Sequence, residues 1–90
     1  MRVRFLKKNG ARDFLDLVVE KLNSPSLRGI LQFGFDVKYS ALKNYYSGAR
    51  LMPKRLVLEI CEVAGIDFEG LEIEEVGDFW GQEKGGMAKK

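Results

Sequence analysis

Between residues 11 and 65, apolar residues recur in four short stretches at helical spacing, and glycine, proline or asparagine residues separate each stretch from the next. Apolar residues spaced three or four positions apart predict amphipathic helices. Asn9 can cap the first helix, which ends near Asn23, and Pro25 opens a second helix that Gly34 limits to about two turns. These helix-ending residues permit only short helices, and the four helical stretches predict a mainly α fold.

The third and fourth helices have the clearest boundaries. Asp36 can cap a helix that runs from about Val37 to Ser47, and Gly48 ends it because glycine readily adopts the left-handed backbone conformation. Pro53 opens the fourth helix and Gly65 ends it. The apolar spacing of all four predicted helices directs one set of side chains into a common core, namely Phe14, Leu15, Val18, Leu31, Val37, Leu42, Tyr45, Ile60, Cys61 and Val63.

Both ends of this helical region carry a different pattern. Residues 1–8 and 71–76 alternate apolar with charged side chains, which is the period of a half-buried strand. The charged residues are basic in the first stretch and acidic in the second, so pairing the two strands sets arginine opposite glutamate. We therefore expect four to five helices and a short two-stranded β ribbon made by the termini.

The chain length leaves room for one domain. Its 90 residues fall within the usual size of a single domain, and we assign residues 1–80 to it. Residues 81–90 contain three glycines and are expected to form a flexible tail, which Trp80 can anchor and which carries the weakly basic arm Lys84, Lys89 and Lys90.

Cysteine and histidine usage restricts the chemistry. The single cysteine, Cys61, cannot form an internal disulfide, which fits a reducing compartment, and no apolar run approaches the ~18 residues of a membrane span. With no histidine, the chain lacks the usual zinc sites and the histidine-activated nucleophiles. We expect a cytoplasmic, non-enzymatic protein without metal or cofactor, in which Cys61 is a buried thiol.

The net charge of +2 hides a strong asymmetry. Residues 1–55 carry 12 Lys and Arg against 4 Asp and Glu, and residues 56–90 carry 3 against 9. A field polarised in this way attracts polyanions to its basic end. The pattern predicts a negative surface over residues 69–78 and a positive surface over Arg28, Lys38, Lys43, Arg50, Lys54 and Arg55.

Residues 35–50 read FDVKYSALKNYYSGAR and are followed by Pro53 and a helical stretch from Leu56 to Ile66. This arrangement resembles the phage-repressor-like helix-turn-helix domain of the Cro/CI and XRE type. The resemblance implies sequence-specific binding of double-stranded DNA, a role in transcription regulation, and dimers on two-fold operators.

Individual positions match the family pattern. Leu31 matches a buried aliphatic position of the helix before the recognition helix, and Leu42 and Tyr45 match two buried positions of the recognition helix itself. Gly48 and Arg50 match the glycine and the basic residue that follow. Asp36 stands where the family has its turn glycine, so either Gly34 supplies the unusual backbone angle or the two helices pack differently.

The residue types support DNA binding independently of the family resemblance. An α-helix fits the major groove, where amide, hydroxyl and cationic groups on one helix face can read base edges. The predicted third helix offers such groups in Lys38, Tyr39, Ser40, Lys43, Asn44 and Ser47. By position in the family, the base readers are Tyr39, Ser40, Lys43 and Asn44. Phosphate contacts are assigned to Arg28, Arg50, Lys54 and Arg55.

Other interpretations of the same residues stay open. The polar face of the third helix can be an ordinary solvated face. Aromatic residues among lysines also suit single-stranded nucleic acid or RNA, and a small domain of this kind can be an antitoxin-like module that binds a protein. Tyr45 is expected in the core and Tyr39 at the surface, while Tyr46 is undecided.

Overall fold

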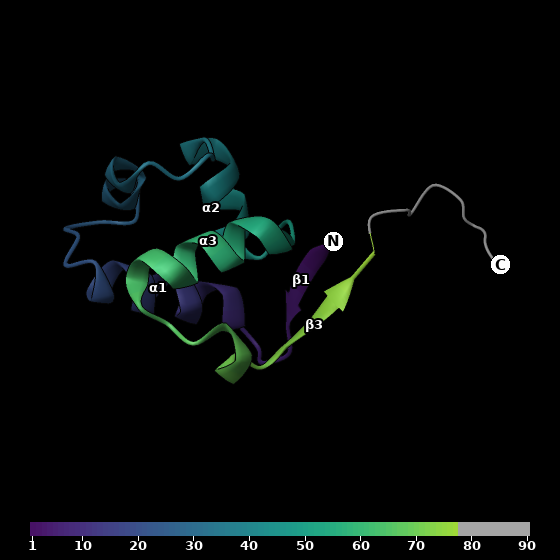
Figure 1. Ribbon diagram of the computed structural model, residues 1–90. Helices are drawn as coiled ribbons and strands as arrows, with labels where there is room; N and C mark the ends of the chain where they lie inside the picture. The colour runs from purple at the N-terminus through teal and green to yellow at the C-terminus, as the bar shows by residue number, and fades with distance from the viewer. Residues whose placement is uncertain (78–90) are drawn as a thin grey trace, which may run out of the picture.

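The computed structural model describes residues 1–77, in which three α-helices, two short 3₁₀ helices and a three-stranded antiparallel sheet follow one another (Figure 1). The mainly helical composition confirms the predicted class. The elements in chain order are β1 (Arg2–Phe5), α1 (Gly10–Lys21), η1 (Arg28–Phe33), α2 (Tyr39–Ser47), β2 (Met52–Pro53), α3 (Lys54–Ala64), η2 (Phe68–Gly70) and β3 (Ile73–Val76).

Helix α1 and helix α3 follow the predicted boundaries closely. Asn9 is the N-cap of α1, but it has a left-handed backbone (φ 60°) and its side chain makes no capping hydrogen bond. Pro53 precedes α3 and Gly65 ends it with φ 73°, where the Ile66 amide donates to the Cys61 carbonyl at 2.9 Å. Glycine ends α3 for the predicted reason, since it adopts a positive φ without steric cost.

The predicted second helix is wrong in type and start, because η1 is a 3₁₀ helix that begins at Arg28. Before it, the Ser24 hydroxyl donates to the Ser26 carbonyl at 2.7 Å, and the Ser26 hydroxyl accepts from the Gly29 amide at 3.2 Å. Such local side-chain bonds compete with helix formation and delay its start. Gly34 ends η1 with φ 87°, so Gly34 supplies the unusual backbone angle of the turn.

The recognition-helix candidate starts two residues later than predicted. Asp36 does not cap it: the N-cap of α2 is Lys38, which is extended. The Val37 amide donates to the Phe35 carbonyl at 2.9 Å, and Phe35 is buried. Val37, which the sequence pattern assigned to the helix, therefore belongs to this tight turn, and Lys38 becomes the N-cap.

Strand β1 lies in the middle of the sheet, between β2 and β3. The predicted pairing of the two ends is confirmed, with Arg4 opposite Glu74 and an ion pair of 2.6 Å between them. The expected two-stranded ribbon is nevertheless a three-stranded sheet, because Met52 and Pro53 pair with Val3 and Arg2. A two-residue strand is too short to show an alternating pattern in a sequence.

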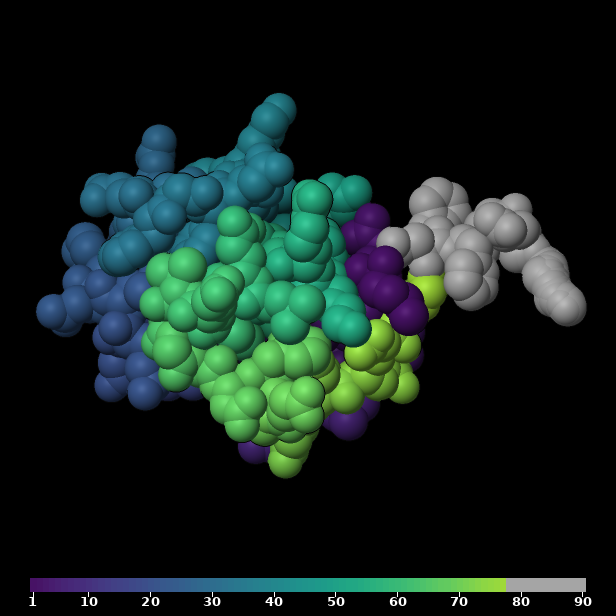
Figure 2. Space-filling model, in the orientation of Figure 1, coloured from purple at the N-terminus to yellow at the C-terminus, as the bar shows by residue number. Residues whose placement is uncertain are grey.

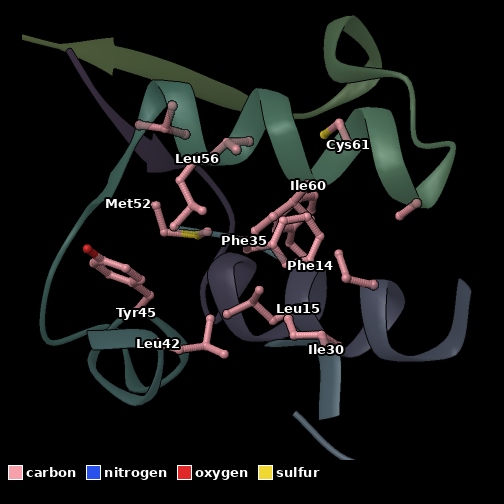
Figure 3. Close-up of a cluster of buried hydrophobic side chains, with 14 residues drawn as sticks. Phe14, Leu15, Ile30, Phe35, Leu42, Tyr45, Met52, Leu56, Ile60 and Cys61 are labelled. Atoms are coloured by element: carbon pink, nitrogen blue, oxygen red, sulfur yellow. The ribbon is translucent and has the colours of Figure 1, made fainter. Parts of the chain in front are cut away.

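The core lies among α1, α2, α3 and the sheet, and Figure 3 shows many of its side chains. Leu42 and Ile60 have no exposed surface and Tyr45 is 8% exposed, as predicted. Leu31 and Val37 are only partly buried at its edge. The prediction of a buried Val63 is wrong: this side chain is 45% exposed, because it lies just outside the buried stripe of α3, which consists of Leu56, Val57, Ile60, Cys61 and Ala64.

The Cys61 thiol is buried, as the sequence pattern predicts. Its pKa is raised from 9.0 to about 11, first by burial and second by the negative charge of Asp67. Because the folded chain keeps the proton that the unfolded chain releases, this group should cost stability as pH rises from about 9 to about 11. Unfolding free energies from pH 7 to 11 should fall more steeply for the native chain than for Cys61→Ala. Parallel profiles would show that Cys61 keeps an ordinary pKa.

No helix within residues 1–77 is long and apolar enough to cross a membrane. Several expectations fall on residues outside the described range: the acidic contribution of Asp78, the anchoring role of Trp80, and the flexible tail of residues 81–90 with its basic arm.

Candidate nucleic-acid interface

Helix α2 presents one polar face to solvent. Leu42 and Tyr45 point into the core, and on the opposite side Ser40, Lys43 and Ser47 are exposed. This division follows from the 3.6-residue helical period. The helix is thus held by its apolar face and presents hydroxyl and cationic groups to solvent, where the Ser47 hydroxyl also donates to the Asn44 carbonyl at 3.2 Å.

Asn44 is half-buried on the same side of α2. Within residues 1–77 its side-chain amide has no hydrogen-bond partner, while its backbone carbonyl accepts from the amides of Ala49 at 2.9 Å and Arg50 at 3.3 Å. An unpaired carboxamide offers both a donor and an acceptor, which is the pair of groups that adenine presents in the major groove. The bonds to its carbonyl also place the backbone of Arg50 at the end of α2.

Tyr39 connects η1 with α2 through two cations. The Arg28 guanidinium carbon lies 5.2 Å from the centre of the Tyr39 ring, and the Lys43 ammonium nitrogen lies 5.4 Å from it. Both distances are within the range of cation–π attraction. The structure thus brings together three residues that the sequence assigned to DNA, and Tyr39 is half-buried rather than fully exposed.

Lys38 and Arg50 flank α2 at its two ends. Lys38 is exposed at the N-cap, where its carbonyl accepts from the Leu42 amide at 3.0 Å. Arg50 is exposed beyond Gly48, which ends α2 with φ 85°. The outward face of α2 therefore has a cation before it, one within it and one after it.

Lys54 and Arg55 do not join this surface. Lys54 forms an ion pair of 3.1 Å with Glu75 on β3, so the predicted separation of the positive and negative surfaces is wrong at this point. Lys54 opens α3 directly after β2, and the pairing of β2 and β3 with β1 brings the two side chains together. Arg55 lines a shallow depression with three acids, Asp36, Glu59 and Glu62.

The acidic strand otherwise lies away from α2. Figure 1 shows α2 at the top of the molecule and β3 at the lower right, and Figure 2 shows the teal-blue residues that include α2 on the opposite side of the surface from the yellow-green residues of β3. Two further acids pair with basic residues near the N-terminus. Glu74 of β3 pairs with Arg4, and Glu72, which directly precedes β3, pairs with Lys7 at 3.7 Å.

Tyr46 joins α2 to α1, a role that the sequence left undecided. Its hydroxyl donates to Asp16 Oδ1 at 2.8 Å, and the Arg12 guanidinium carbon lies 5.6 Å from the centre of its ring. Sequence reasoning gave Arg12 no role, because only the packing of α1 against α2 places it near the end of the polar face.

No protein-family model matches the chain, and neither a curated protein nor a solved structure is significantly similar to it.

Proposed function

We propose that this protein binds double-stranded DNA in a sequence-specific manner, with the outward face of α2 in the major groove, and that it regulates transcription without catalysing a reaction. The observation that carries the proposal is the unpaired amide of Asn44 beside the exposed Ser40, Lys43 and Ser47 on one helix face. Groups of these kinds, presented on a helix, are what readout of base edges in the major groove requires.

The cations around α2 support the same proposal. Arg28 and Lys43 are held on the Tyr39 ring, and Lys38 and Arg50 are exposed at the helix ends. None of these four side chains forms an ion pair within residues 1–77, so they are available to phosphates. Phosphate contacts orient a helix on the duplex, and base contacts select the sequence.

We also propose that the chain acts as a homodimer, as the helix-turn-helix resemblance implies. Two copies related by a two-fold axis can place their α2 helices in major grooves one helical turn apart. The ratio of protein to duplex at saturation tests this part separately.

The proposal is tested by titrating the full chain against four labelled ligands: a duplex selected from a random library, its scrambled version, a single strand and a structured RNA. We expect the selected duplex to bind most tightly. For every duplex, the logarithm of the binding constant should fall with the logarithm of salt concentration, by about 0.9 per neutralised phosphate.

Three outcomes would contradict the proposal. If selection enriches no sequence, α2 does not read bases. If the single strand or the RNA binds at least as tightly as the selected duplex, the chain is an RNA or single-stranded nucleic-acid binding module instead. Failure to bind any of the four ligands would favour a protein partner.

A further inference from the structure

A cleft of about 240 Å³ opens between β1, the beginning of α1 and the segment from the end of α2 to β2. Its lining contains four basic residues, Arg4, Lys7, Arg12 and Arg50, and we call it the basic cleft. Among the described residues that line it there is no Asp or Glu. A hollow with cations on its walls and no acid concentrates positive potential and attracts anions.

Two of the four cations have acidic partners outside the cleft. Arg4 pairs with Glu74 and Lys7 pairs with Glu72, and neither glutamate belongs to the lining. These pairs are exposed and therefore contribute little to stability. Within residues 1–77, Arg12 and Arg50 form no ion pair, and Arg12 only rests against the Tyr46 ring. Both therefore line the same hollow without an acidic partner among the described residues.

The backbone adds donors to these side chains. Gly10, Ala11 and Arg12 form the first turn of α1 and line the basic cleft. The first amides of a helix lack partners within the helix and carry a partial positive charge. The Gly10 amide donates a hydrogen bond to the Lys7 carbonyl at 3.0 Å, but the amides of Ala11 and Arg12 have no acceptor within the described residues. An anion in this cleft therefore meets backbone donors as well as guanidinium groups.

The basic cleft is continuous with the end of the recognition-helix candidate. Ser47 and Gly48 line it, and Arg50 belongs both to its wall and to the predicted phosphate contacts. Guanidinium groups match the geometry of phosphate oxygens and bind them through paired hydrogen bonds.

We propose that the basic cleft binds a phosphate group through Arg12, Arg50 and the first amides of α1. The bound phosphate group can come from two sources: the backbone of the DNA that α2 contacts, or a free phosphate compound. The first source rests on the proposed function and extends the DNA footprint from α2 to the start of α1. The second source does not depend on it.

The first arm of the test uses inorganic phosphate. The full chain, labelled with ¹⁵N, is titrated with phosphate at constant ionic strength, and amide shifts are compared for the native chain, Arg12→Gln and Lys21→Gln. Lys21 is an exposed residue in the last turn of α1, at the other end of the helix from the cleft. We expect saturable shifts at Ala11, Arg12 and Arg50 that Arg12→Gln weakens at least threefold and Lys21→Gln leaves unchanged.

The second arm uses the selected duplex. With a DNA source, Arg12→Gln should weaken duplex binding about fivefold and lower the salt slope by about 0.9, while Lys21→Gln stays within twofold of the native chain. Saturable phosphate shifts without an effect of Arg12→Gln on duplex binding would support the cleft and assign it to a free phosphate compound. The same shifts in a chain that binds no duplex would overturn the proposed function alone.

The proposal is overturned if phosphate shifts are spread evenly over the exposed lysines and arginines, or if Arg12→Gln changes neither the phosphate titration nor duplex binding. Thermal melts of both variants check that the fold is kept. A destabilised Arg12→Gln is replaced by Arg12→Lys, which keeps the charge but loses the paired hydrogen bonds, and which should weaken phosphate binding less than Arg12→Gln does.

Discussion

Replacing Leu42 by alanine should lower the free energy of unfolding by ~2 to 5 kcal/mol. Leu42 has no exposed surface, and Figure 3 shows it projecting from α2 into the buried cluster with Leu15 and Ile30. Truncation removes buried methyl groups and leaves a cavity that close-packed neighbours fill only in part. Because Leu42 and Tyr45 are the two buried residues of α2, this helix should loosen first.

The matched control is Leu58→Ala, which makes the same chemical change on α3 at a side chain that is 42% exposed. It should cost under about 1 kcal/mol, since exposed positions seldom contribute more. Urea denaturation of the two variants and the native chain measures both effects. An equal, small loss for both would mean that Leu42 is not a core residue and that the outward face of α2 has been assigned to the wrong side.

Replacing Asn44 by alanine should weaken binding to the selected duplex by ~1 to 3 kcal/mol and leave binding to scrambled duplex almost unchanged. The Asn44 amide is unpaired within the described residues and lies on the polar side of α2. Its loss removes a base contact and no charge, so the salt dependence should stay the same. Discrimination between the two duplexes should therefore fall.

Arg50→Gln provides the contrasting variant, because Arg50 is exposed beyond the end of α2 and carries an uncompensated charge. It should weaken binding to both duplexes alike and reduce the salt slope by about 0.9. Lys54, which the sequence suggested for this role, is engaged with Glu75 and is the poorer choice. Titrations of both variants on both duplexes across a salt series separate the two effects. If Asn44→Ala and Arg50→Gln weaken the two duplexes equally, α2 does not read sequence.

The part of the candidate site on α2 itself was predictable. Leu42 and Tyr45 occur at core spacing, and the polar residues between them must then face outward, because one helical period sets both sides. The cation–π contacts of Tyr39 were not predictable, since Arg28 reaches the ring only through the packing of η1 beside α2. Nor was the basic cleft, whose walls come from β1, α1 and the segment after α2.

The sequence alone determined the features that depend on neighbours along the chain. Glycine sets the end of α2, and proline and glycine set the start and end of α3, because their backbone preferences act locally. The alternation in residues 1–8 and 71–76 is also a local pattern, and the opposite charges of the two stretches predicted the pair in which Arg4 meets Glu74. Tertiary structure alone decided two further features, the third strand β2 and the pairing of Lys54 with Glu75. These features depend on which distant segments pack together, and a local residue pattern does not carry that information.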